Sequence, residues 1–263
     1  MHIDNSRRVL QPGQVDIWFC ATQDRRLDSH FKNYEALISD EEREQYKQMA
    51  SSDQGRDYLI SRALLRTVLA QYCDAAADEL ALSTNEFGKP QLDTQNSGLQ
   101  FNTAHSPGLT LCAVSSAEVG IDAEYHSDAG GMLDAADDYL SARELQALRS
   151  HPADGQLSLF FRYWTLKEAY LKARGEGLST PLHDFSIILD GGEFAEFDGP
   201  DSEQWDFRVL AQNEQYTVSL ALREHIESLN YFQTIPLATD EELPTAGEGL
   251  PKYEARSANR LTG

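Results

Sequence analysis

The feature of this sequence that most constrains its fold is a weak internal repeat, in which similar patterns recur in the same order at offsets of 102 to 107 residues. Segments with the alternation of β-strands begin at Val15 and Val119. Each is followed by a Ser-x-x-Glu capping box, at Ser39 and at Ser141, and such a box predicts the start of a helix. The repeat therefore predicts two similar halves.

A long helical pattern follows in each half. Apolar side chains recur at spacings of three and four over residues 58–72 and again from Phe160, and Gly175 predicts the end of the second helix. Segments typical of buried strands then begin at Leu109 and Tyr216. We predict an α+β fold, a pseudo-dimer of two similar lobes. Each lobe is a small antiparallel sheet packed with helices, and the active site lies at the lobe interface.

The chain divides into three parts on this interpretation. Residues 1–117 form the N-terminal lobe, residues 118–236 form the C-terminal lobe, and residues 237–263 form an irregular tail. The tail is assigned from its polar and turn-forming composition, which is poor in the apolar residues that a packed core requires.

Composition excludes several classes of protein. The 263 residues carry a formal net charge of −21, which argues against general nucleic-acid binding because phosphates would be repelled. We interpret this acidity as an adaptation of the surface to solubility or salt. No segment approaches the roughly 20 apolar residues that span a bilayer, and the first residues contain no apolar core of a secretory signal. These features predict a cytoplasmic protein without a membrane or nucleic-acid partner.

The cysteines point to neither a disulfide framework nor a metal site. Cys20, Cys73 and Cys112 are odd in number, far apart in the sequence and set among apolar residues. Buried thiols are the better interpretation, with zinc ligation as the alternative.

Two acidic residues on one expected strand form the first candidate site. In Val119-Gly-Ile-Asp-Ala-Glu, Ile121 and Ala123 would face the core, and Asp122 and Glu124 would face the opposite side. Two neighbouring carboxylates repel each other unless a cation lies between them, and hard oxygen ligands favour Mg²⁺ or Mn²⁺. The same alternation is also typical of a strand with one solvated face.

Charged residues on the second long helix form another candidate. Glu168 and Lys172 lie one turn apart on one helix face, together with Thr165. An exposed pair of this kind contributes only about 0.3 kcal/mol. The rest of this helix is largely aromatic and aliphatic, however, so the pair is expected to be buried and to have a specific partner. A metal ion and a phosphate would supply one.

Two turns in the first half offer groups for an anionic ligand. Gly88-Lys89-Pro90 would hold one lysine in a fixed place, and His105-Ser106-Pro107-Gly108 forms a second turn just before a strand. Taken alone, each turn is weak evidence. Together they supply cationic and hydrogen-bond donor groups.

These residues together resemble a known family. The segments that carry the resemblance are Gly88-Lys89-Pro90, Phe101-Asn102-x-x-His105-Ser106, Gly120-Ile121-Asp122-x-Glu124 and Trp164-Thr165-x-Lys167-Glu168-Ala169-x-x-Lys172. Their order and spacing are similar to those of the 4′-phosphopantetheinyl transferases of the longer, Sfp-type class, over roughly residues 15–225. That resemblance implies a two-lobed enzyme that moves the 4′-phosphopantetheine arm of coenzyme A to a serine of an apo acyl, peptidyl or aryl carrier protein, releasing 3′,5′-ADP.

The resemblance also implies roles for individual residues. Asp122, Glu124 and Glu168 match the family's Mg²⁺ ligands, and Glu168 matches the group thought to help deprotonate the acceptor serine. Lys172 matches a lysine at the phosphate of the leaving group. The remaining matches are to residues that bind coenzyme A, namely Arg56, Lys89, Pro90, His105 and Ser106. A monomer is expected, because two lobes in one chain already build the cleft that shorter relatives build by association.

The sequence departs from the family pattern at three positions. Ala104 stands where the family often has a serine, and Glu42 and Gln45 stand where it often has lysines that hold the 3′-phosphate of coenzyme A. The nearby Arg43 and Lys47 are candidates to replace those lysines. Two other functions remain open at this point, a metal-dependent phosphohydrolase and a non-catalytic protein that binds coenzyme A or a carrier.

Overall fold

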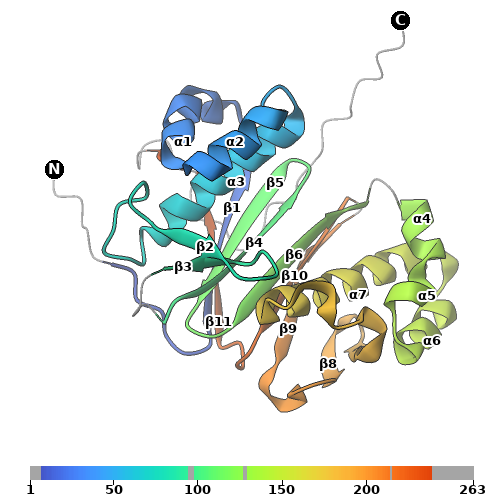
Figure 1. Cartoon of the computed structure of the whole chain (residues 1–263). Coiled ribbons are helices and arrows are strands. Elements are labelled where there is room, and N and C mark those ends of the chain that lie inside the picture. Colours follow the sequence, from blue (N-terminus) through green and yellow to red (C-terminus); the bar gives the residue numbers. More distant parts are fainter. Residues whose placement is uncertain (1–6, 94–97, 127–128, 214, 239–263) are drawn as a thin grey trace, which may run out of the picture.

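The computed structural model describes residues 7–93, 98–126, 129–213 and 215–238. Two groups of helices flank a set of strands, with α1, α2 and α3 on one side and α4, α5, α6 and α7 on the other (Figure 1). The α+β pseudo-dimer predicted from the sequence is confirmed. Residues 239–263, most of the expected irregular tail, lie outside the described part of the chain.

The two halves contain corresponding elements in corresponding order. The first half consists of β1 (Gln14–Ala21), η1 (Arg25–His30), α1 (Phe31–Leu37), α2 (Asp40–Met49), α3 (Asp53–Leu69), β2 (Leu82–Thr84), β3 (Pro90–Leu92), β4 (Gln100–Ser106) and β5 (Leu109–Ser115). The second consists of β6 (Val119–Tyr125), α4 (Ala129–Asp134), α5 (Ala136–Tyr139), α6 (Ala142–Ser150), α7 (Ala153–Arg174), η3 (Gly177–Ser179), η4 (Leu182–Asp184), β7 (Ser186–Asp190), β8 (Glu193–Asp198), η5 (Ser202–Gln204), β9 (Asp206–Gln212), β10 (Tyr216–Leu222) and β11 (Ser228–Gln233).

The strand order shows the same similarity between the halves. One sheet has the order β11-β1-β5-β4 and the other has the order β6-β10-β9. In each, the first strand of the half pairs antiparallel with a late strand, which pairs in turn with the strand before it. Two small hairpins, β2-β3 and β7-β8, complete the described strands.

The predicted helix boundaries are present at both capping boxes. The Ser39 hydroxyl accepts a hydrogen bond from the Glu42 backbone, and the Glu42 carboxylate accepts one from the Ser39 backbone. The same reciprocal pair joins Ser141 and Glu144 at the start of α6. At the end of α7, Gly175 has φ of 67°, the left-handed conformation in which glycine carries no Cβ penalty.

The last described strand does not follow the simple division of the chain. β11 lies within the range 118–236 expected for the C-terminal lobe, but it pairs in parallel with β1 in the first sheet. Stacking of Trp18 on Phe232, with ring centroids 4.4 Å apart, holds the two strands together. Alternation predicts a strand but not the sheet that it joins, so the sequence pattern could not locate this pairing.

An apolar core joins the two sheets. The odd-numbered face of β6 packs against side chains of β1, β5 and β10, and the buried residues of this core include Val15, Ile17, Phe19, Leu111, Ala113, Val119, Ile121, Ala123, Val218 and Leu220. As predicted, Ile121 and Ala123 face the core. The opposite face of β6 is therefore directed toward α7.

A buried ion pair holds the second lobe together around α7. Lys167 is 0% exposed, and its ammonium lies 2.9 Å from the Glu144 carboxylate. It also donates to the carbonyl oxygens of Leu182 and Phe185, at 2.6 and 2.7 Å. Glu144 accepts in addition from the Ile187 backbone, so the pair connects α6, α7 and β7. The charges are buried but fully hydrogen-bonded, which is the condition for a buried pair to be tolerated.

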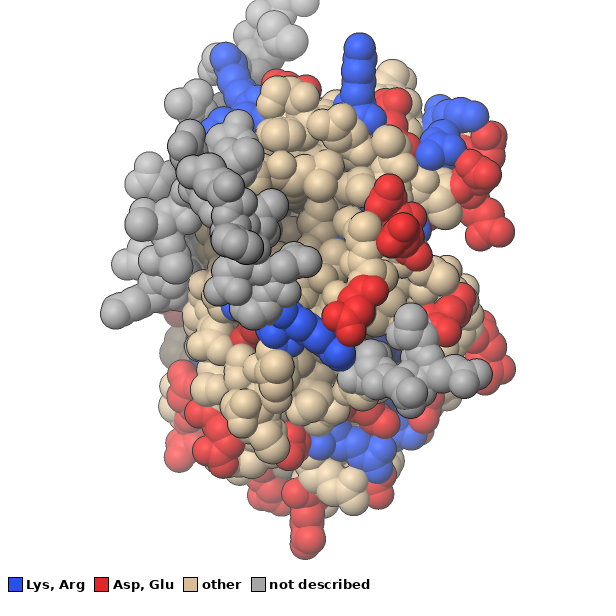
Figure 2. All heavy atoms as spheres, turned by 90° about the vertical axis from the view of Figure 1, so that its left-hand side faces the viewer, with Lys and Arg blue, Asp and Glu red and all other residues tan. Residues whose placement is uncertain are grey.

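The formal net charge of −21 is reflected in acidic side chains at the surface, one face of which is shown in Figure 2. On the face shown in Figure 2, Asp and Glu side chains are spread widely, with Lys and Arg among them and an area of other residues in the upper half.

The two deeply buried thiols, Cys20 and Cys112, have pKa values raised by burial, whereas Cys73 is half-buried. The expectation of buried thiols therefore holds for Cys20 and Cys112 but not for Cys73.

Replacing the buried lysine tests its structural role. We expect Lys167→Met to lower the free energy of unfolding by about 3 to 5 kcal/mol, because it leaves Glu144 buried without its cation. Urea denaturation of the wild type and the variant measures this. Lys47→Met removes an exposed lysine and should change stability by no more than about 0.5 kcal/mol. Equal stability of the two variants would contradict this role for Lys167.

Candidate active site

A cleft of about 780 Å³ lies where the two lobes meet. Elements of both lobes line it, with α2, α3, the β2-β3 turn and β4 on one side and β6 and α7 on the other. The cleft brings together most of the residues predicted from the sequence, namely Lys89, Pro90, His105, Ser106, Glu124, Glu168 and Lys172. Asp122 and Arg56 are not among the lining residues.

The close approach of α7 to β6 positions the acidic residues. A Cβ atom at Gly120 would overlap the backbone of Ala169 and Ala173 on α7. The glycine in this motif is therefore required by helix-strand packing, since its backbone is not in the left-handed region. The side chains that follow it on the same strand face, Asp122 and Glu124, meet the α7 face that carries Glu168 and Lys172.

Asp122 lies at the buried end of this group. Its Oδ1 accepts a hydrogen bond from the Lys172 ammonium at 2.6 Å, and the aspartate side chain is 5% exposed. Its Oδ2 is buried without a hydrogen-bond partner among the described residues. A buried carboxylate oxygen without a partner is costly, so this atom requires a ligand that the protein side chains do not supply.

The two glutamates are electrostatically coupled to Asp122. Burial, together with the negative charges of Asp122 and Glu124, raises the pKa of Glu168 to about 7. Burial and Asp122 also raise the pKa of Glu124, whose carboxylate accepts a hydrogen bond from Trp164 Nε1 at 3.2 Å. Two glutamates whose pKa values are raised by burial and by neighbouring carboxylates form, together with Asp122, a site where a cation would be stabilised.

The residues present fit a divalent cation by their chemistry, although they are not arranged as a completed metal cluster. Within the described ranges, no three His, Cys, Asp or Glu side chains are gathered in ligating geometry. Asp122 is instead paired with Lys172, so a lysine now occupies one face of the donor set. The unpartnered Oδ2 of Asp122 and the oxygen-only donors are the properties that suit Mg²⁺ or Mn²⁺.

The Gly-Lys-Pro turn is fastened to the end of α7. Lys89 donates from its ammonium to the Ala173 carbonyl at 2.6 Å, and Asn85 donates from its side-chain amide to the Gly175 carbonyl at 2.6 Å. The Asn85 side chain also accepts from the Lys89 backbone, which shapes the turn. Burial lowers the pKa of Lys89 to about 8. The turn therefore links the first lobe to the end of α7 and places a lysine in the cleft.

His105 and Ser106 occupy a strand rather than the predicted turn. They are the last two residues of β4, and the turn that follows is formed by Pro107 and Gly108. The interstrand register continues to the Ser106–Leu109 pair, so hydrogen bonding extends the strand to the proline. Burial and the charge of Lys172 lower the pKa of His105.

Arg56 does not line the cleft and has partners elsewhere. Its guanidinium donates to the Thr22 and Asp24 carbonyl oxygens and pairs with Asp28 at 2.7 Å. It also lies 4.9 Å from the Phe31 ring centroid. All of these partners belong to the first lobe, and a contact of Arg56 with coenzyme A stays a prediction.

Two motif residues have structural roles that the sequence interpretation did not assign. Asn102 Oδ1 accepts a hydrogen bond from the Ile121 backbone at 3.0 Å, which links β4 of one lobe to β6 of the other. Trp164 orients Glu124 through its indole nitrogen. Both residues stand inside the motifs quoted above, but a motif does not reveal which of its members hold the others in place.

Models of two protein families match successive parts of the chain. Residues 25–117 match the model described as 4′-phosphopantetheinyl transferase, N-terminal, and residues 118–221 match that of the 4′-phosphopantetheinyl transferase superfamily. Together these matches cover both lobes of the cleft.

Curated proteins give the same result. The chain is 31% identical to the 4′-phosphopantetheinyl transferase HetI of Nostoc sp. over 217 residues, which is 81% of this chain and 90% of HetI. It is 29% identical to a 4′-phosphopantetheinyl transferase of Bacillus subtilis over 209 residues, covering 79% and 90%. For the transferase Sfp of Bacillus subtilis strain 168, the identity is 29% over 171 residues, covering 65% and 75%. The chain belongs to the 4′-phosphopantetheinyl transferase superfamily, in its Sfp-type group.

The contact at Gly120 generates a prediction. We expect Gly120→Ala to lower the free energy of unfolding by about 1 to 3 kcal/mol, because the added methyl group displaces α7 from β6. Urea denaturation measures the change. Gly131→Ala is the matched control, because a Cβ there meets open space on helix α4. That variant should be neutral or more stable by up to about 1 kcal/mol. Similar losses in both variants would argue against close packing as the reason for Gly120.

Proposed function

We propose that this enzyme transfers the 4′-phosphopantetheine group of coenzyme A to a serine of an apo carrier protein. The supporting observation is the meeting of Glu124, Glu168 and Lys172 in one interlobe cleft, where Lys172 pairs with the buried Asp122. The opposite wall carries Lys89 and His105, which offer donors to phosphate oxygens.

The proposed reaction is a displacement at phosphorus. The serine Oγ forms a bond to the β-phosphate, the one attached to pantetheine, and the bond from that phosphorus to the bridging oxygen breaks. The electron pair leaves with the bridging oxygen, so 3′,5′-ADP is the leaving group. The serine proton goes to a carboxylate, and the raised pKa of Glu168, about 7, suits it for accepting that proton at neutral pH. Lys172 lies where its positive charge would stabilise the leaving phosphate.

A divalent cation belongs to this proposal. Asp122, Glu124 and Glu168 would hold Mg²⁺, with Mn²⁺ as an alternative, through hard carboxylate oxygens. When bound, the ion would supply positive charge to the pyrophosphate oxygens. Lys172, which pairs with Asp122 in this structure, would be the residue that supplies positive charge to a phosphate oxygen.

The proposed partners and location follow from the same interpretation. Acyl, peptidyl and aryl carrier proteins are the acceptor classes, and a monomer suffices because both walls of the cleft come from one chain. No helix in the described ranges is long and apolar enough to cross a membrane. We propose a cytoplasmic enzyme.

Removal of one carboxylate tests the catalytic assignment. Glu168→Ala should reduce pantetheine transfer at least about a hundredfold, because it removes both the proton acceptor and a proposed cation ligand. Mass spectrometry of several apo carriers, incubated with coenzyme A and Mg²⁺, measures the gain of one phosphopantetheine. Glu193→Ala, at an exposed position on β8, is the control and should retain wild-type activity. Full activity of Glu168→Ala would rule out this site.

Incubation without a carrier separates the transferase from a phosphohydrolase. A transferase should leave coenzyme A intact when Mg²⁺ is present and no acceptor is added. Rapid release of 3′,5′-ADP under those conditions would show a hydrolase instead. Tight coenzyme A binding with no turnover on any carrier would show a non-catalytic binding protein.

Metal removal tests the cation. We expect a chelator such as EDTA to abolish transfer and added Mg²⁺ or Mn²⁺ to restore it, because the carboxylates then again share a positive ion. The divalent cation should also raise the thermal unfolding temperature of the wild type, by binding the folded state. Asp122→Asn should weaken that stabilisation. Transfer that continues at full rate after chelation would exclude this role for the three carboxylates.

A further inference from the structure

The wall of the cleft formed by α2 and α3 carries one cationic side chain among the described lining residues. Gln45 and Met49 of α2 and Tyr58, Ser61 and Arg62 of α3 line this wall. The acidic residue of the same wall, Asp57, interacts with Thr22, the Gly108 backbone and His105. Arg62 is therefore the side chain on this wall that can supply positive charge to an anionic ligand.

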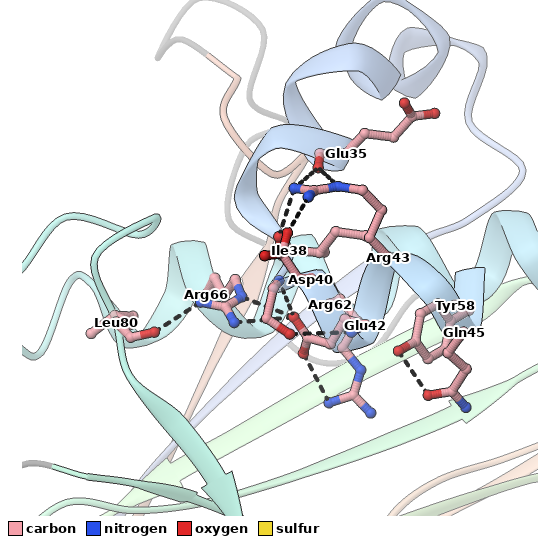
Figure 3. Close-up of polar contacts among 11 residues, drawn as sticks. Glu35, Ile38, Asp40, Glu42, Arg43, Gln45, Tyr58, Arg62, Arg66 and Leu80 are labelled. Atoms are coloured by element: carbon pink, nitrogen blue, oxygen red, sulfur yellow. Dashed lines mark hydrogen bonds and ion pairs between the residues drawn. The ribbon is translucent and has the colours of Figure 1, made fainter. Parts of the chain in front are cut away.

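Glu42 does not cancel the positive charge of Arg62, because the Glu42 carboxylate is already paired with a second arginine, Arg66. Its Oε2 accepts hydrogen bonds from Arg66 at 3.0 and 3.3 Å, and from the Ser39 backbone at 2.8 Å. Arg66 is 5% exposed and donates in addition to the Leu80 carbonyl. Figure 3 shows the Glu42 carboxylate between the guanidinium groups of Arg62 and Arg66. One carboxylate between two arginines leaves a net positive charge.

The two nearby cations considered from the sequence are engaged elsewhere. Arg43 donates to the carbonyl oxygens of Glu35 and Ile38 and pairs with Asp40 at 2.6 Å, so it is directed toward α1 (Figure 3). Lys47 pairs with Glu44 on the exposed surface of α2. Neither residue lines the cleft. The expectation that they replace the family's lysines is not supported by their geometry.

Arg62, in contrast, has hydrogen-bonding capacity left to use. Its Nη1 lies 3.8 Å from Glu42 Oε1, beyond hydrogen-bonding distance. Its Nε is buried and has no hydrogen-bond partner among the described residues. The guanidinium lies 5.4 Å from the Tyr58 ring centroid, and the Tyr58 hydroxyl donates to Gln45 at 3.0 Å. The ring thus steadies the guanidinium beside two polar groups of the same wall.

We propose that Arg62 binds the 3′-phosphate of coenzyme A, with Gln45 and Tyr58 beside it. Arg62 would thus replace the lysines that the family often has at the positions of Glu42 and Gln45. This inference rests on the proposed function and identifies how this chain recognises that substrate. Coenzyme A carries two separate anionic groups, the pyrophosphate and the 3′-phosphate. The other two lining ammonium groups lie at α7, Lys89 at the Ala173 carbonyl and Lys172 at Asp122, and the proposed function assigns them to the pyrophosphate. Arg62 and α7 line opposite walls of the same cleft, so a single coenzyme A molecule could contact Arg62 with its 3′-phosphate and α7 with its pyrophosphate.

The experiment compares two nucleotides that differ only in the 3′-phosphate. Isothermal titration calorimetry measures the Kd of adenosine 3′,5′-bisphosphate and of adenosine 5′-monophosphate, without a carrier and without turnover. The wild type should prefer the bisphosphate. In Arg62→Gln that preference should fall by about 10- to 100-fold, the usual range for a charge-assisted hydrogen bond to phosphate. Arg62→Lys should keep an intermediate preference, because it retains the charge but not the planar donor pair.

Lys47→Gln is the matched control, since it removes one positive charge from the adjacent helix and should leave the preference unchanged. A wild-type preference retained in Arg62→Gln, or an equal loss in Lys47→Gln, would overturn the inference. Equal affinity of the wild type for both nucleotides would overturn it as well. Failure of the wild type to bind coenzyme A at all would instead overturn the proposed function. Should Arg62→Gln not fold, Arg62→Lys decides the question, because an undiminished preference in that variant contradicts bidentate recognition.

Discussion

The site depends on one constraint, the contact between β6 and α7 at Gly120. A strand and a helix can approach this closely only where the strand has no Cβ atom, and here the Ala169 backbone fills that space. The approach places Asp122 and Glu124 against Glu168 and Lys172, and burial together with the repulsion between the carboxylates raises the pKa of Glu168. A shift of the helix by the width of a methyl group would lengthen the distances between these charges and weaken their coupling.

The same strand also joins the two lobes. Its odd-numbered residues, such as Ile121, lie in the apolar core between the sheets, while its even-numbered residues face α7. Because side chains alternate between the two faces of a strand, one face of β6 stabilises the core and the other carries the candidate catalytic residues. Asn102 adds a polar link across the same boundary by accepting from the Ile121 backbone. Along β6, the residues that join the lobes therefore alternate with the residues that would act in the cleft.

Local patterns predicted much of this structure. The capping boxes at Ser39 and Ser141 and the terminal glycine of α7 are short-range signals, and all three mark helix ends in the structure. Contacts between distant segments were beyond reach, because neither alternation nor helical spacing encodes them. The pairing of β11 with β1 and the orientation of Arg56 toward Asp28 are of this kind. The proposed phosphate-binding role of Arg62 likewise depends on tertiary contacts, namely the pairing of Arg43 with Asp40 and of Arg66 with Glu42.

The parallel pairing of β11 with β1 has a consequence for how the protein is made. Until residue 233 has left the ribosome, β1 presents an unsatisfied edge, and the aromatic partner of Trp18 has not been synthesised. The N-terminal half therefore cannot complete its sheet until β11 has been synthesised, although nearly all of its sequence emerges early. Separate expression of that half would yield a sheet open to intermolecular strand addition. The two halves resemble duplicated units, but β11, which is the last described strand of the second half and pairs with β1 of the first, joins them into one folding unit.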